Sequence, residues 1–130
     1  ELIATARHKG YRLALATTTT PANVDALLKV TLGGSAMFEV ICAGDSVTHK
    51  KPAPDVFELT LSKLRLPPTA CVAIEYSRNG LLAAVSARIP TVVTPGIYTA
   101  AQRFEEAAMV IADLAAFDFR KIYSLTSPAG

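Results

Sequence analysis

Short apolar runs alternate with helical patterns along almost the whole chain, and this alternation limits the possible folds more than any other feature. A run such as residues 71–74 (CVAI) is apolar on both faces, which is typical of a strand buried between two layers of helices. Because strands that alternate with helices form βαβ units, the pattern predicts a Rossmann-like three-layer α/β sandwich with a mainly parallel sheet. The expected strands cover residues 11–16, 38–43, 71–74, 91–94 and 109–112, and the expected helices cover 2–9, 21–32, 54–64, 79–87 and 99–107.

Composition excludes several classes of protein. The chain has 130 residues, 51% of them hydrophobic, and a formal net charge of +2, so it is long enough for one globular domain. The basic residues are scattered, which argues against nucleic acid as a partner, and no apolar stretch reaches membrane-spanning length. Cys42 and Cys71 lie in apolar runs with no metal-ligand spacing, so we expect buried free thiols in a reducing, cytoplasmic compartment.

Polar side chains follow three of the expected strands, at the point where each strand ends. Thr17 and Thr18 follow the first of these strands, Lys51 lies in the loop after the second, and Glu75 ends the third. The carboxyl ends of parallel strands meet at one edge of a sheet, where ligands bind in open α/β folds. Hydroxyls and an ammonium group suit a phosphate, and a carboxylate can hold Mg²⁺. The edge therefore predicts a site for a phosphorylated small molecule.

Each of these residues also has an ordinary structural interpretation. A threonine run before Pro21 can simply cap the following helix, and adjacent lysines in a loop commonly form a solvated surface. A glutamate at the end of a strand is commonly a surface or capping group. Only their expected position at one edge favours the functional interpretation.

Four segments also resemble motifs of a known family. Residues 13–19 (LALATTT) are similar to a strand that ends in Ser or Thr, called motif II in haloacid-dehalogenase-superfamily phosphatases. Residues 49–57 (HKKPAPDVF) resemble the segment whose Lys before Pro is motif III, and residues 72–84 (VAIEYSRNGLLAA) resemble motif IV, EDSxxGxxAA. Residues 94–99 (TPGIYT) resemble the segment after the next strand in the CbbY and β-phosphoglucomutase-like branch. The resemblance runs from about residue 3 to residue 117.

This resemblance implies a reaction and a role for each matching residue. Family members form an aspartyl-phosphate on an Asp nucleophile, and water then hydrolyses it with Mg²⁺ balancing the charge. Thr17 and Lys51 would be the catalytic residues that contact the transferring phosphoryl group, with Thr18 beside them in phosphate binding. Glu75 would help to place the Mg²⁺. The substrate implied for this branch is a sugar phosphate or bisphosphate.

The sequence departs from the family pattern in three ways. It contains no DxDGT nucleophile motif and no cap domain, and Tyr76 replaces the motif IV Asp. A phenol is neutral at pH 7 and is a poorer Mg²⁺ ligand than a carboxylate. Three hypotheses follow: part of a sugar-phosphate phosphatase that is inactive alone, a non-catalytic phosphate-binding domain, or a structural remnant without a ligand.

The same departures predict an incomplete core. We expect residues 1–117 to form a partial core domain that lacks its first strand, which carries the nucleophile, and residues 118–130 to form a C-terminal tail. The missing strand would lie between the strand that ends near Thr17 and the strand that ends at Glu75. The gap would close by direct pairing or be filled from another chain, giving a homo-oligomer through exposed sheet edges. Residues 117–125 could supply such a strand, or form an ordinary final helix.

Overall fold

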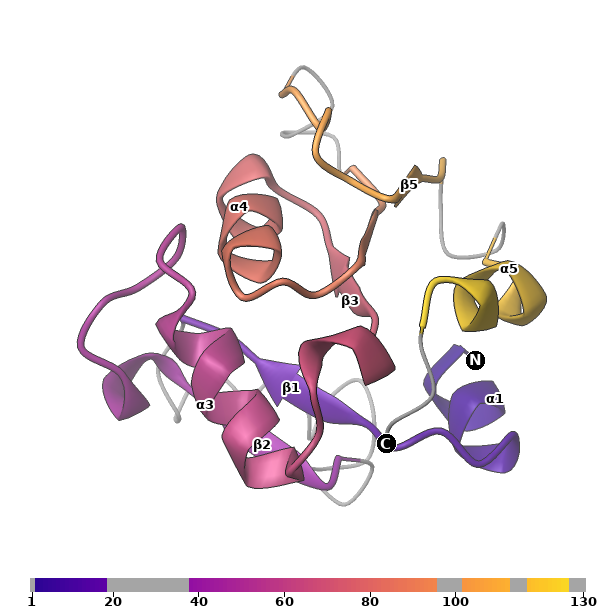
Figure 1. Cartoon of the computed structure of the whole chain (residues 1–130), viewed down its shortest axis with the longest axis horizontal. Coiled ribbons are helices and arrows are strands. Elements are labelled where there is room, and N and C mark those ends of the chain that lie inside the picture. The colour runs from indigo at the N-terminus through magenta and orange to yellow at the C-terminus, as the bar shows by residue number, and fades with distance from the viewer. Residues whose placement is uncertain (1, 19–37, 96–101, 113–116, 127–130) are drawn as a thin grey trace.

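The computed structural model describes residues 2–18, 38–95, 102–112 and 117–126 (Figure 1). Strands and helices alternate through these residues, as the sequence pattern predicts. The elements in order are α1 (Leu2–His8), β1 (Ala14–Ala16), β2 (Val40–Cys42), the short 3₁₀ helix η2 (Gly44–Ser46), α3 (Asp55–Leu64), the 3₁₀ helix η3 (Pro68–Ala70), β3 (Ala73–Glu75), α4 (Arg78–Ser86), β4 (Thr91–Val93), β5 (Met109–Val110) and α5 (Phe119–Ser124).

The described strands are parallel and form two sheets. β1 pairs with β2 in the register Ala14 to Val40, and β4 pairs with both β3 and β5. Parallel strands joined through helices confirm the predicted Rossmann-like α/β class. The prediction that the gap closes by direct pairing is wrong for the described residues, because β1 and β3 belong to separate sheets.

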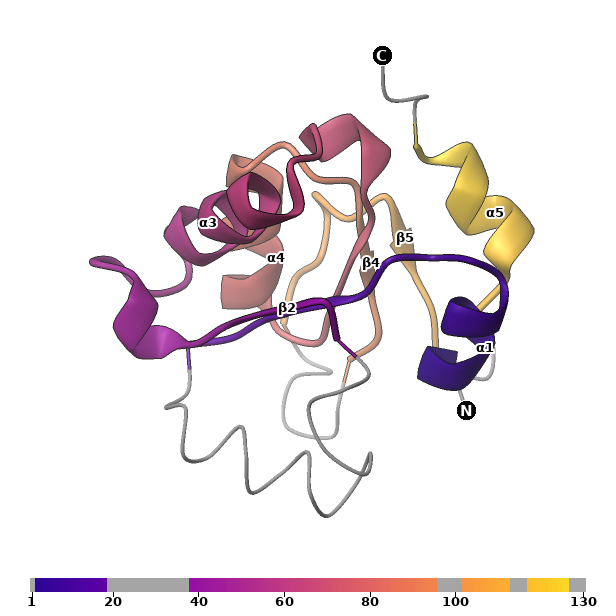
Figure 2. The same cartoon turned by 90° about the horizontal axis from the view of Figure 1, so that it is seen from below.

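Helices α3 and α4 cover the same side of the strands, as Figure 2 shows. α3 packs on β1 and β2, α4 packs on β3 and β4, and the two helices also contact each other. The fully buried side chains between these layers include Val56 of α3, Leu81 of α4 and Val92 of β4. Burial of these apolar side chains is the main force that holds helices on strands. The two sheets are therefore connected through the helix layer.

Among the described residues, no strand pairs with the side of β1 that faces away from β2 or with the side of β3 that faces away from β4. The Leu13 carbonyl and the Thr17 amide bond to the β2 side, so alternation directs the Ala16 carbonyl away from β2. On β3, the Ala73 amide and the Glu75 carbonyl bond to the β4 side. The backbone groups of Ile74, between them, face the other way. Residue Ile74 is 42% exposed, an unusual value for the middle of a strand in an α/β fold.

The C-terminal segment folds as helix α5, beside α1 (Figure 1). Asp118 caps it by accepting a hydrogen bond from the Arg120 amide, and Ile122 is buried. The centroids of the Phe119 and Tyr11 rings lie 5.4 Å apart. The helical interpretation of this segment is confirmed and the strand interpretation is wrong, because a cap and one buried apolar side chain favour a helix here. The domain boundary at residue 117 stays a prediction.

The structure does not bear out the expected helix 99–107 and does not describe the expected helix 21–32. Residues 102–107 are not helical, so the predicted helix 99–107 is wrong over this part, and residues 99–101 lie outside the described residues. The Arg103 carbonyl and the Glu106 carboxylate bind Arg78 instead, so tertiary contacts override the local pattern. The expected helix 21–32 also lies outside the described residues. No helix in the described part of the chain is long and apolar enough to cross a membrane.

Candidate functional site

Lys51 connects the ends of the two sheets. It lies in the loop before α3, and its ammonium group donates to the Ala16 carbonyl at the end of β1 (3.2 Å). The same group donates to Oε2 of Glu75 at the end of β3 (2.6 Å). Its side chain is only 14% exposed and its Nζ lies 5.0 Å from the ring centre of Phe57. The fold therefore places a largely buried ammonium group where the carboxyl ends of β1 and β3 meet.

Glu75 is the buried partner of this cation. It ends β3, and its side chain is 7% exposed. Its carboxylate lies against Gly80 in the first turn of α4: a Cβ on Gly80 would come within 2.0 Å of Oε1. Ser77 caps this helix, because its Oγ accepts a hydrogen bond from the Gly80 amide (3.1 Å). The absence of a side chain at Gly80 thus allows Glu75 to reach Lys51.

Thr17 and Thr18 follow the end of β1 in the chain. Thr17 directly follows Ala16, whose carbonyl binds Lys51, and its own amide donates to the Cys42 carbonyl (2.9 Å). Both threonines are half-buried. The edge predicted from strand ends therefore brings Lys51 together with Glu75 at the end of β1, next to Thr17 in the chain, as parallel strands require.

The loop that carries Lys51 is closed by Asp55, a contact that residue types alone did not predict. Oδ2 of Asp55 accepts a hydrogen bond from the His49 amide (3.2 Å) and lies 3.1 Å from Nδ1 of the same His49. Asp55 also begins α3, where a carboxylate is favourable near the helix N-terminus. The KPAPD spacing is the sequence signal for this closure, since it puts Asp four residues after Lys.

Arg78 anchors the start of α4 to residues 102–106, a second feature that sequence reasoning missed. Its guanidinium makes two hydrogen bonds of 3.0 Å to the Glu106 carboxylate and donates to the Arg103 carbonyl (2.7 Å). The hydrogen bond from Arg78 lowers the pKa of Glu106, and the same bond raises the pKa of Arg78. No local signal could have revealed this pair, because its members lie 28 residues apart.

The described residues do not form a magnesium site of the kind that the resemblance implies. In the described ranges, no three His, Cys, Asp or Glu side chains come together to hold a metal ion. Glu75 is engaged by Lys51, and the neighbouring Tyr76 is a phenol whose residue is 64% exposed. Proteins usually bind Mg²⁺ through one or two carboxylates, with waters and phosphate oxygens completing the octahedron, and here the carboxylate at this edge is already paired with Lys51, so this donor set does not fit the ion.

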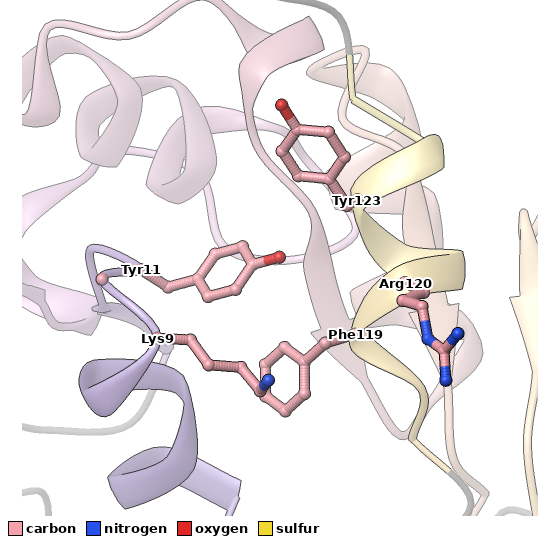
Figure 3. A pocket seen from close by; sticks show the side chains of 6 residues that line it. Lys9, Tyr11, Phe119, Arg120 and Tyr123 are labelled. Carbon is pink, nitrogen blue, oxygen red and sulfur yellow. The ribbon is translucent and has the colours of Figure 1, made fainter.

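A groove of about 550 Å³ lies away from these residues, between the end of α1 and helix α5 (Figure 3). The side chain of Lys9 lies over the ring of Phe119, and Tyr11 and Tyr123 point into the same region. None of the predicted site residues lines this groove, which is formed by Lys9, Gly10, Tyr11, Phe119, Arg120 and Tyr123.

Comparison with known proteins agrees with the geometry. Residues 1–88 match the model of the haloacid dehalogenase-like hydrolases. The chain is 52% identical over 118 residues to the protein CbbY of Rhodobacter capsulatus, covering 89% of this chain and 52% of the relative. It is 43% identical over 130 residues to the protein CbbY of Cereibacter sphaeroides, covering 98% of this chain and 56% of the relative.

A solved structure shows the same arrangement. The crystal structure of CbbY from Rhodobacter sphaeroides in complex with phosphate matches with a TM-score of 0.85 and 45% identity, over 88% of this chain and 52% of that one. The chain spans about half the length of these relatives. The matched family model, the identities and the fold together show that the chain belongs to the haloacid dehalogenase-like hydrolases.

Proposed function

We propose that the chain is the phosphate-binding part of a CbbY-type sugar-phosphate phosphatase. The observation that carries this proposal is the position of Lys51, a largely buried ammonium group at the shared end of β1 and β3. Lys51 would neutralise charge on a phosphoryl group, and the hydroxyls of Thr17 and Thr18 would donate to its oxygens. The two unpaired cysteines, Cys42 and Cys71, support a reducing, cytoplasmic compartment.

The ligand class is supported by what the relatives bind. One crystal structure of CbbY from Rhodobacter sphaeroides contains phosphate, and a mutant of the same protein was crystallised with xylulose-1,5-bisphosphate. A sugar phosphate or bisphosphate is therefore the proposed substrate class of the whole enzyme. Identities of 43–52% with the CbbY proteins support this branch of the family over others.

We expect these 130 residues to bind phosphate without turning over a phosphate ester. Formation of an aspartyl-phosphate requires an Asp nucleophile, and the sequence contains no DxDGT motif. Among the described residues Lys51 donates to Ala16 and Glu75, which leaves one ammonium hydrogen for a further acceptor, and this favours retained phosphate binding over a purely structural remnant.

A phosphatase assay with two matched lysine variants tests this proposal. Xylulose-1,5-bisphosphate and Mg²⁺ are supplied to the wild type, to Lys51→Met and to Lys50→Met, whose exposed lysine is the control. The expected result is no release of phosphate by any of the three. Turnover that is lost in Lys51→Met and kept in Lys50→Met would overturn the proposed inactivity. Inorganic phosphate should shift the amide resonances of Thr17 and Thr18 in the wild type and in Lys50→Met only.

We also propose that the free edges of β1 and β3 promote self-association. Edges with unpaired amides and carbonyls bind further strands readily, and the two sheets are not joined by a strand among the described residues. Light scattering across a concentration series should give a mass above 13.7 kDa. A monomer at every concentration would contradict association through these edges.

A further inference from the structure

We infer that the phosphate site of this chain works without a divalent cation, because Glu75 is the counter-ion of Lys51 and Tyr76 supplies no second carboxylate. The inference rests on the proposed phosphate binding and changes how that site is expected to work. Members of the family generally use Mg²⁺, so the inference departs from the family at this site.

The geometry first shows that the Glu75 carboxylate is already engaged. Its Oε2 accepts a hydrogen bond of 2.6 Å from Lys51, and both side chains are largely buried, at 7% and 14% exposed. Its Oε1 lies against Gly80, where even a methyl group would have no room. A cation on this carboxylate would have to approach a buried ammonium group of like charge, which costs energy in a poorly solvated site.

The neighbouring position offers no replacement ligand. Tyr76 follows Glu75, and its residue is 64% exposed, so the phenol lies largely in solvent. A neutral phenol contributes no negative charge to balance Mg²⁺. Within the residues that the structure describes, no third acidic or imidazole side chain joins Glu75.

A phosphate could still bind, through directed hydrogen bonds. An ammonium group has three donors, and among the described residues Lys51 gives two of them to Ala16 and Glu75. One proton is therefore left for a phosphate oxygen, next to the end of β1, which Thr17 and Thr18 follow in the chain. Because the charges of Lys51 and Glu75 cancel, net charge adds little to the attraction for a phosphate. We therefore expect a weak affinity for phosphate.

The decisive variant is Glu75→Gln, because the two roles of Glu75 predict opposite results. If Glu75 is the counter-ion, the amide leaves the charge of Lys51 uncompensated and phosphate binds several-fold more tightly. If Glu75 is a ligand of Mg²⁺, the amide weakens Mg²⁺ binding, and the affinity for phosphate falls in Mg²⁺ buffer. Gln keeps the volume of Glu, and far-UV circular dichroism checks that the variant folds.

The experiment titrates inorganic phosphate into the 130-residue chain, followed by amide and lysine ammonium resonances, in buffer with either Mg²⁺ or EDTA. We expect the wild type and Tyr76→Phe to give equal dissociation constants in the two buffers. Tyr76→Asp adds a carboxylate, and we expect its phosphate affinity to rise about tenfold with Mg²⁺. Binding of Mn²⁺ alone, followed by electron paramagnetic resonance, should be detected in Tyr76→Asp and not in the wild type.

Three results would overturn the inference while leaving phosphate binding intact: wild-type affinity that requires Mg²⁺, wild-type binding of Mn²⁺ alone, or weaker phosphate binding in Glu75→Gln. Absence of phosphate binding by the wild type in both buffers would instead refute the proposed function, and the inference with it. The Mn²⁺ measurement does not depend on phosphate, so it tests the role of Glu75 in that case as well.

Discussion

Replacing Gly80 with alanine should destabilise the chain, although alanine is the better helix former. Gly80 lies in α4, and its backbone is not in the left-handed region, so helix propensity alone predicts a gain of about 1 kcal/mol. However, the new Cβ would lie 2.0 Å from Oε1 and 2.5 Å from Cδ of Glu75. The carboxylate must therefore move, and it is held by Lys51.

The expected magnitude follows from what that movement breaks. Overpacking a buried position costs about 1–3 kcal/mol. Full separation of a buried ion pair, which leaves one charge without its partner, costs about 3–5 kcal/mol and sets an upper limit. Since the Glu75 side chain can rotate and keep part of its contact with Lys51, we expect Gly80→Ala to lower the free energy of unfolding by about 1–3 kcal/mol.

Urea unfolding followed by far-UV circular dichroism measures this change, because the chain has no Trp to report by fluorescence. Asn79→Ala is the matched control: it lies in the same turn of α4 with an exposed side chain and should gain a few tenths of a kcal/mol. In a Lys51→Met/Glu75→Ala background the contact is gone, so Gly80→Ala should stabilise. Stabilisation by Gly80→Ala in the wild type, equal to that of Asn79→Ala, would refute the reasoning.

Two further predictions concern titratable groups. Because the hydrogen bond from Arg78 lowers the pKa of Glu106, the pair stabilises the fold above the usual carboxyl pKa, and its contribution is lost as the pH falls through the lowered value. The urea midpoint of Arg78→Gln should therefore change less with acid than that of the wild type, and identical curves would contradict this role. Burial raises the pKa of the Cys71 thiol, so iodoacetamide should modify Cys71 more slowly than a free thiol, and the fully buried Cys42 more slowly still. Mass spectrometry of timed samples follows both sites, and labelling of either residue at the free-thiol rate would contradict its burial.

Much of the fold follows from local pattern. The run 91–94 became β4 and the run 71–74 became β3, shifted by at most two residues, because strands apolar on both faces have few alternatives to a covered parallel sheet. Gly10 ends the first helix with a φ of +88°, a conformation that few other residues adopt. Residues 102–107 show where local pattern fails, since contacts with Arg78 from a distant part of the chain decide their conformation.

The sequence by itself determined the α/β class and the family, and it predicted the edge at which Lys51 meets Glu75 next to the end of β1, because each depends on short-range pattern and on the parallel direction of strands. Only the tertiary structure decided that the described strands form two sheets and that one ammonium group contacts both. Only the structure showed that Lys51 holds the Glu75 carboxylate against Gly80, where a side chain on Gly80 would collide with it. These features depend on distances between segments far apart in the sequence, which are set by the packing of α3 and α4 on the strands.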